Sequence, residues 1–385
     1  MDKVVFMGIE YSLVSDIESF TLLRDEWANL LNNSSICSPF LTWEWLYTWW
    51  IEYGQKDPNN TLAIVLGKRE GEIVSILPGY IKQEKIGGMR VNAFYFLGSE
   101  YESSDYLEII TIDDQNPAHV TEILNWLISS HNIDILRLYN ILEYRPILKY
   151  LQHLCDERKF EYHVYPHRIC PFIPIKGDYE SFLQSLSKSM RYNVRRHTRQ
   201  LFQKFGAEFG WLQTQNEADV ENGIKQLFEL HERRFRSKNW DTIFQNELRG
   251  AFHTKVSKLL SKRGILRLFR LMVEGVPIAM MYSFEYQGEL FFFQIGMDPA
   301  WEKQSAGQVL IGQVVRYCFD NGLNRFDFMR GGETYKFRWT DKARMIVVVD
   351  MGVTSIGKLI VRTEYFTFQI KRFIKTKLLK KEEQY

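Results

Sequence analysis

Residues 266–297 read LRLFRLMV-EG-VPIAMMYSFEY-QG-ELFFFQIGM. Three apolar runs stand in this stretch, at Leu266–Val273, Ile278–Tyr286 and Glu289–Met297. They are separated by Glu274-Gly275 and Gln287-Gly288, and pairs of this kind form tight turns between antiparallel strands. The stretch therefore predicts a three-stranded antiparallel meander.

The segments around the meander indicate how its sheet is completed. Apolar residues recur at helical spacing in Tyr179–Phe205, Glu217–Arg236, Gln245–Lys262 and Ala306–Asn321. Two further strands are predicted at Arg325–Phe328 and, after Gly331-Gly332, at Thr334–Trp339. Helices and antiparallel strands in this order indicate a mixed α+β domain.

The first half alternates strand-like and helix-like segments in a similar way. Helices are predicted at Asp16–Leu31, Thr42–Tyr53, Ala118–Ser130 and Ile147–Lys159. Strands are predicted at Thr61–Leu66, Ile73–Ile81, Phe94–Leu97, Tyr106–Ile112 and Ile135–Tyr139. Single cores stop growing near roughly 250–300 residues, so 385 residues favour two domains. The Pro-containing segment Cys170–Lys176 is the best candidate boundary.

Composition narrows the class of protein. A net charge of +2 argues against bulk attraction to nucleic acid, and no DNA partner is expected. The four cysteines form no C-x-x-C pair, so no metal site is expected. We find no leader-like start and no apolar run of about 18 residues, which together favour a cytoplasmic protein.

The step from the meander to the next helix is a candidate anion site. Helix N-termini present unpaired backbone N–H groups and the positive end of the dipole, and small residues let a phosphate approach them. Ser305, Ala306 and Gly307 are small, and Lys303 and Gln304 add charge and donors. In the alternative interpretation Ser305 only caps the helix and Gly307 is tolerated in its first turn.

A second candidate site follows the strand at Arg325–Phe328. Asp327 alternates with Phe326 and Phe328, and a charge inside an apolar strand is costly unless it is paired or functional. Arg330, Glu333, Tyr335 and Lys336 follow around the Gly-Gly break. The alternative is a structural ion pair, Asp327–Arg330 or Glu333–Lys336.

Two basic segments complete the set of candidates. Arg191, Arg195 and Arg199 recur every four residues and form one stripe of a helix, which suits an anionic partner or is simply a solvated face. The tail from Lys358 to Tyr385 holds eight Lys/Arg and three acidic residues. Its apolar residues at helical spacing suit an anionic membrane surface, or a terminal helix packed on the body.

Taken in order, these segments resemble the CelD-like branch of the GNAT acyltransferases, a bacterial group linked to polysaccharide biosynthesis. The matching residues run from about residue 20 to 345: Trp43-Glu44-Trp45 with Trp49-Trp50, Ser187-Lys188, Arg191 to Arg196, Gly275 to Ala279, Gly296 to Trp301 with Ser305 to Gly307, Phe326 to Gly331, and Tyr335-Lys336. The plan is also similar to the FemAB-type peptidoglycan aminoacyltransferases, which pair two GNAT-like folds.

The resemblance implies a degenerate GNAT-like lobe at 1–170 and a GNAT acyltransferase domain at 171–352. The basic tail at 353–385 lies outside the resemblance. The resemblance also implies an acyl-CoA donor, with the thioester beside Glu289–Met297 and the pyrophosphate at the helix start. The implied donor-binding residues are Gln294, Gly296, Lys303, Gln304, Ser305, Ala306, Gly307 and Gln308. The sequence Gln304-Ser-Ala-Gly-Gln-Val keeps only one glycine of the usual Q/R-x-x-G-x-G/A signature.

The chemistry expected is transfer of an acetyl or other acyl group to an amine or hydroxyl of a small molecule, sugar or lipid-linked cell-envelope precursor. Asp327 is the preferred general base, Glu333 the second, and Tyr335 a donor to the leaving thiolate. Arg191, Arg195, Arg330 and Lys336 are expected to hold an anionic acceptor. Two alternatives stay open: a FemAB-like enzyme that uses aminoacyl-tRNA, and a catalytically inactive GNAT-fold binding module. The tail is expected to contact the inner membrane face.

Overall fold

The structure, a computed structural model, describes residues 5–6, 8–101, 104–213, 216–238 and 246–382, without the side chains of 5–6 and 375–382. The chain divides into two compact units. Unit 1 comprises residues 1–36, 40–167 and 346–385, and unit 2 comprises residues 37–39 and 168–345. Residues 346–385 thus group with the first half of the chain, whereas the sequence placed 346–352 in the second domain and 353–385 in a separate tail.

Unit 1 contains two groups of paired strands. The first follows the order β1 (Val5–Phe6), β2 (Ile9–Val14), β4 (Ile64–Arg69), β5 (Glu72–Leu77) and β8 (Ile110–Thr111). The second follows the order β16 (Ala343–Gly352), β9 (Ile135–Leu142), β7 (Met89–Phe96), β6 (Gly79–Ile86) and β3 (Asn60–Leu62). Only β7 and β9 pair in parallel within the described part of this unit.

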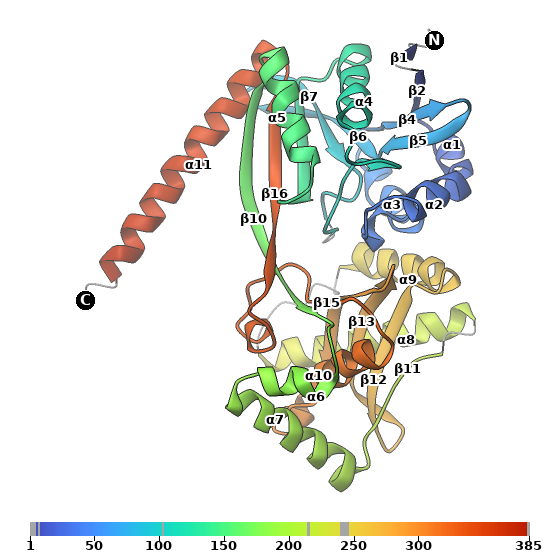
Figure 1. The fold of residues 1–385 in the computed structure, drawn as a ribbon, viewed down its shortest axis with the longest axis vertical. Helices are drawn as coiled ribbons and strands as arrows, with labels where there is room; N and C mark the ends of the chain where they lie inside the picture. Colours follow the sequence, from blue (N-terminus) through green and yellow to red (C-terminus); the bar gives the residue numbers. More distant parts are fainter. Residues whose placement is uncertain (1–4, 7, 102–103, 214–215, 239–245, 383–385) are drawn as a thin grey trace. The chain divides into compact units, whose positions relative to one another are not determined.

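Helices of unit 1 pack around these strands, except that the last of them extends away from the strands over much of its length (Figure 1). They are α1 (Ile17–Leu22), α2 (Arg24–Asn32), α3 (Trp43–Glu52), α4 (Pro117–Ser130), α5 (Ile147–Arg158) and α11 (Ser355–Glu382). The aromatic residues of α3 form core: Trp45 and Trp49 are fully buried, and their indole N–H groups donate to Ser104 Oγ and to the carbonyl of Glu100. A buried Trp with a satisfied N–H stabilises the interior of a domain.

Unit 2 is built on the predicted meander. Its strands follow the order β11 (Glu208–Trp211), β12 (Leu266–Val273), β13 (Val276–Tyr286), β14 (Glu289–Met297), β15 (Arg325–Asp327) and β10 (Glu161–Pro174), of which β10 begins in unit 1. Both meander turns have positive φ at their two central residues, Glu274-Gly275 and Gln287-Gly288. This is the type I′ geometry that suits the twist of a hairpin.

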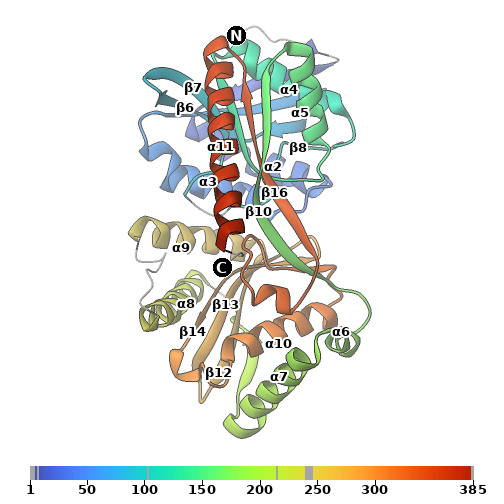
Figure 2. The same ribbon diagram turned by 90° about the vertical axis from the view of Figure 1, so that its left-hand side faces the viewer.

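Helices cover both faces of this sheet (Figure 1 and Figure 2). They are α6 (Tyr179–Ser185), α7 (Lys188–Arg199), α8 (Glu217–Ser237), α9 (Glu247–Lys262) and α10 (Ala306–Asp320). Helices α8 and α9 pack on the face that carries Tyr282 and Gly296. Helices α6, α7 and α10 share a core with the opposite face, which carries Phe269, Leu290 and Phe292. The expected α+β class is confirmed.

Several predicted elements differ in the structure; the strand predicted at Tyr106–Ile112, for example, is limited to β8. Thr334–Trp339 is not a strand but a turn with a 3₁₀ helix at Lys336–Arg338, because Lys336 and Trp339 both point inward. The helix predicted at Asp16–Leu31 divides at Leu23, and Tyr179–Phe205 divides into α6, α7 and a π-helical turn at Gln200–Lys204. No described helix is long and apolar enough to cross a bilayer.

Candidate functional site

The sheet of unit 2 opens between β14 and β15. The two strands pair in parallel only from Glu289 to Phe291, opposite Arg325 to Asp327. On its other edge β14 stays paired with β13 as far as Met297. The outer edge of β14 beyond Phe291 therefore has no strand partner in the described part of unit 2. Peptide N–H and C=O groups along such an edge are available to an extended ligand.

A β-bulge lies at the start of this opening. Tyr282 faces Gln294 and Ser283 faces Phe292, so Phe293 is an extra residue in β14. A bulge bends its strand and re-aims the side chains around it. The Gln294 side-chain oxygen accepts a hydrogen bond from the N–H of Ile295 at 3.0 Å, which holds that amide at the bulge.

The loops after β14 and β15 lie at the same end of the sheet, because the carboxyl ends of parallel strands do. The loop after β14 leads to α10, whose first N–H groups, at Ala306, Gly307 and Gln308, precede the first intrahelical bond, from Val309 N–H to the Ser305 carbonyl. Ser305 has a left-handed backbone (φ 56°), an uncommon conformation that clusters at functional sites. An anion fits such a helix start.

Three side chains near the start of α10 could contribute to an anion site. The Gln304 side-chain oxygen is buried and has no hydrogen-bond partner in the described structure, and an amide can present either its oxygen or its NH₂ group there. Lys303 is exposed. Gln308 donates weakly to the Met190 sulfur at 3.4 Å. The residues present therefore fit a phosphate group.

Two of the predicted donor-binding glycines are explained by packing. A Cβ on Gly296 would lie 2.8 Å from the His231 nitrogen and 2.8 Å from the Leu227 oxygen, so α8 packs directly on β14 there. A Cβ on Gly307 would lie 3.1 Å from the Met297 sulfur. Both glycines let a helix approach the strand closely, and their Cα atoms face protein rather than an open site.

Asp327 is fully buried at the end of β15. One of its carboxylate oxygens accepts a hydrogen bond from the N–H of Met329 at 2.6 Å, and the other contacts the guanidinium of Arg344. Arg344 also lies 4.0 Å from Glu289, which pairs with Arg325 at 2.9 Å. Asp327 is thus one of two acids in a buried network with two arginines.

This network changes the interpretation of Asp327. A general base needs a lone pair directed at the acceptor, and both carboxylate oxygens of Asp327 already have protein partners. The ion-pair partner that the structure describes for Asp327 is Arg344, which the sequence did not suggest. Burial raises the pKa of Glu289, with a contribution from Asp327, and the two arginines oppose that rise.

Lys336 makes hydrogen bonds that hold the loop after Asp327. Its side chain is only 5% exposed, and the ammonium donates to the carbonyl of Arg330 at 2.7 Å and pairs with Glu333 at 3.0 Å. Lys336 therefore stabilises this loop, which contains two residues with positive φ, Met329 and Gly331. A buried ammonium with these partners does not reach out to an acceptor, contrary to the predicted role.

Two predicted catalytic residues lie at the surface of the same loop. The Glu333 side chain is 57% exposed and its one described ion pair is with Lys336. Tyr335 is 38% exposed and contacts the ring of Phe328 edge-on, with the centroids 6.4 Å apart. Desolvation, and secondarily the Glu333 charge, raise the pKa of Tyr335, so its phenol stays protonated at neutral pH.

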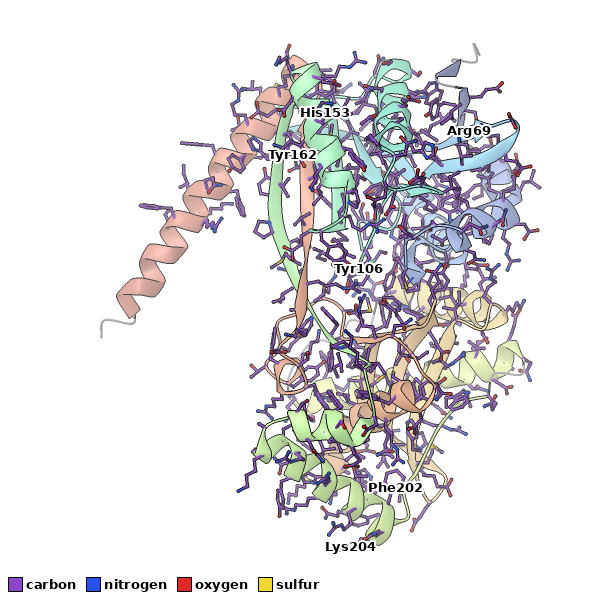
Figure 3. All side chains as sticks on the ribbon, in the orientation of Figure 1. Arg69, Tyr106, His153, Tyr162, Phe202 and Lys204 are labelled. Carbon is purple, nitrogen blue, oxygen red and sulfur yellow. The ribbon has the colours of Figure 1, made fainter. Side chains whose placement is uncertain are left out.

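The predicted basic stripe on α7 is engaged with its own unit. Arg191 donates to the Gln184 carbonyl at 2.9 Å, and Arg195 pairs with Glu180 at 2.6 Å. Helix α7 ends in the π-helical turn at 200–204, where Phe202 and Lys204 are labelled in Figure 3. The structure does not gather Arg191 and Arg195 with Asp327 through any described contact.

Sequence reasoning missed a basic cluster at the end of α8. Three of its members are paired: Arg233 with Asp298 at 3.4 Å, Arg236 with Glu232 at 2.6 Å and Lys238 with Glu302 at 2.6 Å. The guanidinium of Arg234 has no hydrogen bond or ion pair among the described residues. Its charge helps, after Lys238, to lower the pKa of Glu302 and also opposes the pKa rise of Tyr335. The charge of Arg234 therefore acts on one residue in each of the two loops.

Metal ligands are not gathered here: no group of three or more His, Cys, Asp or Glu side chains suited to a metal ion occurs among the described residues.

Comparisons with known proteins agree with this geometry. Residues 188–337 match the family model described as an acetyltransferase (GNAT) domain. The fold is similar to that of FemX, with a TM-score of 0.61 and 10% identity over 85% of this chain and 95% of that chain. No curated protein matches the chain.

Two further solved structures share the fold. One is the C-terminal domain of a putative lysylphosphatidylglycerol synthetase from Agrobacterium fabrum, with a TM-score of 0.51 and 8% identity over 89% of this chain and 96% of that chain. The other is L-PGS from Bacillus licheniformis, with a TM-score of 0.50 and 12% identity over 90% and 96%. Residues 188–337 of unit 2 thus match a GNAT acetyltransferase domain, in a chain whose fold is similar to that of FemX.

Proposed function

We propose that unit 2 transfers an acyl group from acyl-CoA to an amine or hydroxyl of a small molecule, sugar or cell-envelope precursor, as in the CelD-like branch of the GNAT enzymes. The observation that carries the proposal is the open edge of β14, which begins at the Phe293 bulge and leads to the start of α10. An extended donor has main-chain partners along the strand and N–H donors for its phosphates at the helix.

Charge supports the same placement of the donor. Arg234 is an available guanidinium beside the loop that precedes α10, and Lys303 lies within that loop. Guanidinium groups bind phosphates through paired N–H donors. The pyrophosphate of the donor is thus expected between the first turn of α10 and the end of α8.

The residues of the loop after β15 suit the chemical step. When bound, acyl-CoA supplies a thioester carbonyl. Attack by the acceptor forms the new C–N or C–O bond, the C–S bond breaks, and the acceptor proton passes to a carboxylate. We assign that carboxylate to Glu333, because Asp327 is enclosed by Arg344 and Met329. Tyr335, which stays protonated, donates a hydrogen bond to the leaving sulfur.

A second candidate donor is an aminoacyl-tRNA, as in FemAB-like enzymes. The similarity in fold to FemX and to a putative lysylphosphatidylglycerol synthetase favours it, together with the single glycine of the Gln304–Val309 segment. Its binding is expected to weaken steeply with salt, because phosphate contacts dominate. A third candidate is a GNAT-fold binding module without catalytic activity, and the same experiment distinguishes it from the two enzymes.

The test is a thermal-shift and calorimetry series with acetyl-CoA, longer acyl-CoAs, free CoA and aminoacyl-tRNA, since ligands that bind the native state raise its melting temperature. Ser305→Asp places a carboxylate at the start of α10, where it favours the helix by about 0.3–1 kcal/mol but repels a phosphate. Ser305→Asn is the matched neutral control, because Asn also tolerates left-handed φ.

We expect Ser305→Asp to weaken acyl-CoA binding at least tenfold without lowering the melting temperature, and Ser305→Asn to bind normally. Equal affinity of both variants would refute the placement of the donor. A shift with aminoacyl-tRNA and none with CoA compounds would favour the second donor, and binding without transfer to any acceptor would favour the inactive module.

A further inference from the structure

Helix α11 has one face that packs within unit 1. Ile360 and Val361 are buried, the Tyr365 ring stacks on His163 with centroids 3.8 Å apart, and Phe368 contacts Tyr165 edge-on at 4.9 Å. Ion pairs reinforce this face: Arg362 with Glu161 at 2.6 Å and Glu364 with Arg137 at 3.0 Å. The first half of the helix is therefore fixed to β9 and β10.

The other face of α11 is apolar and exposed. Its members, with their exposed fractions, are Ile356 44%, Leu359 57%, Phe366 66%, Ile370 44%, Phe373 60% and Ile374 51%. At about 100° per residue these positions span an arc of roughly 100°, almost opposite the packed face. Figure 3 shows the side chains standing out along this helix. Exposed aromatic and β-branched residues in one continuous row mark an interaction surface.

The same helix carries an excess of positive charge. Ser355–Glu382 contains eight Lys/Arg and two Glu residues, a net of +6, in a protein whose total is +2. The ion pairs of Arg362 and Glu364 are made inside unit 1. The segment from Lys371 to Lys381 then holds six basic residues and no acidic one.

We infer that α11 is a peripheral anchor that lays its apolar row into the interface of an anionic lipid bilayer. An amphipathic helix with aromatic and Ile side chains on one side and Lys/Arg on the other binds such surfaces, by apolar burial together with attraction to anionic headgroups. This inference does not rest on the proposed acyl transfer.

The charge of α11 indicates whether its apolar row contacts a bilayer or a second copy of the chain. Ile356, Leu359, Thr363, Phe366 and Ile370 follow the alternating three- and four-residue spacing of a coiled-coil seam. However, two helices that each have a net charge of +6 repel each other. Residues 365–381 also contain no Asp or Glu that could pair with the lysines of a second copy. An anionic lipid surface complements this charge, whereas another α11 does not.

The experiment is co-sedimentation of the full chain with vesicles of phosphatidylcholine and phosphatidylglycerol in equal parts, compared with phosphatidylcholine alone, at low and high salt. Two variants separate the two contributions: Phe366→Ser/Ile370→Ser removes apolar area, and Lys371→Glu/Arg372→Glu reverses charge. The matched control is Leu22→Ser/Ile112→Ser, which removes apolar residues that are exposed elsewhere in unit 1, at 81% and 43%. Circular dichroism checks that each variant is folded.

We expect the wild type and the control to sediment with anionic vesicles and to be released at high salt. Each α11 variant should partition at least tenfold less. Absence of wild-type binding, or equal binding of all variants, would overturn the inference. A dimer in sedimentation velocity that is lost in Phe366→Ser/Ile370→Ser, without vesicle binding, would assign the row to a second copy instead. Donor binding is expected to be unchanged in every variant, which keeps this test separate from that of the proposed function.

Discussion

Asp327 and Arg344 form an ion pair in the interior of unit 2, with the side chains 0% and 6% exposed. Asp327 ends β15, Arg344 lies in β16, and Glu289 and Arg325 extend the pair into a network of four charges. The ring of Phe172 lies beneath both guanidinium groups, at 4.9 Å from Arg325 and 5.9 Å from Arg344. The network therefore fixes the end of β15, where the loop that carries Glu333 and Tyr335 starts.

Asp327→Asn is expected to destabilise unit 2 strongly. The change removes the charge partner of the buried Arg344 guanidinium, and breaking a buried pair costs about 3–5 kcal/mol. Urea unfolding measures the loss. Arg344→Met combined with Asp327→Asn should recover part of it, because the second change removes the uncompensated charge. A variant of native stability whose turnover falls about 10²-fold would instead make Asp327 the general base.

Gly296→Ala tests the close contact between β14 and α8. The new Cβ would stand 2.8 Å from backbone atoms of Leu227 and His231, which cannot rotate away as a side chain can. We expect a loss of about 1–3 kcal/mol, the scale of overpacking in a filled core. Gly210→Ala is the matched control, since its Cβ meets no atom within 4 Å on β11. Equal stability of the two variants would contradict the packing role.

Arg234→Ala is expected to weaken donor binding by about tenfold or more without an effect on stability. Arg234 has no described ion pair, so its removal leaves no buried group unsatisfied, while a phosphate loses a paired donor. Arg236→Ala is the control on the same helix, because Arg236 is 70% exposed and pairs with Glu232. Calorimetric titration of acetyl-CoA measures both variants, and matching affinities would remove Arg234 from the site.

The burial of Asp350 leads us to expect that the stability of unit 1 depends on pH. Burial, opposed by Arg137, raises the pKa of Asp350 from 3.8 to about 6, and its Oδ1 atom has no hydrogen bond in the described structure. Between these two pH values the folded state keeps the proton and the unfolded chain has released it. The contribution of this group to stability therefore falls as pH rises through that window, by up to about 3 kcal/mol.

Asp350→Asn should remove this decline. The free energy of unfolding of the variant, relative to wild type, is expected to rise between pH 4 and pH 6.5, since all other titrating groups cancel in the comparison. Denaturant unfolding at several pH values gives the difference, and parallel curves for the two proteins would contradict the buried carboxyl.

Local signals determined how much of this fold was predictable. The meander was found because Glu274-Gly275 and Gln287-Gly288 carry their turn chemistry in two adjacent residues. The Asp327–Arg344 ion pair was not predicted, because the two residues are 17 positions apart in sequence and only the order of the strands in the sheet brings them together. The segment Thr334–Trp339, after Gly331-Gly332, was predicted as a strand, but the Lys336 ammonium donates to the Arg330 carbonyl and the segment forms a turn.

The site shows the same division between local and tertiary information. The small residues before α10 predicted a helix start, which the structure has at Ala306. The sequence explained Gly307 by the approach of a phosphate, whereas in the structure the glycine leaves room for Met297 of β14. No local sequence pattern contains this contact. Arg234 was missed because its helix face carries several basic residues, and only the pairing of its neighbours distinguishes it.

Glu333→Gln is the direct test of the proposed base. The Glu333 side chain is 57% exposed, so the amide is expected to leave the fold intact, while Lys336 keeps its bond to the Arg330 carbonyl. An amide cannot accept the acceptor's proton, so transfer from acetyl-CoA to an amine or hydroxyl acceptor should fall about 10²-fold or more. Glu221→Gln is the matched control, because Glu221 is also exposed, at 59%, and pairs with a lysine, Lys258. Steady-state rates at saturating donor, with melting temperatures for both variants, decide the matter: if Glu333→Gln and Glu221→Gln transfer acyl groups equally fast, the proton goes to another group.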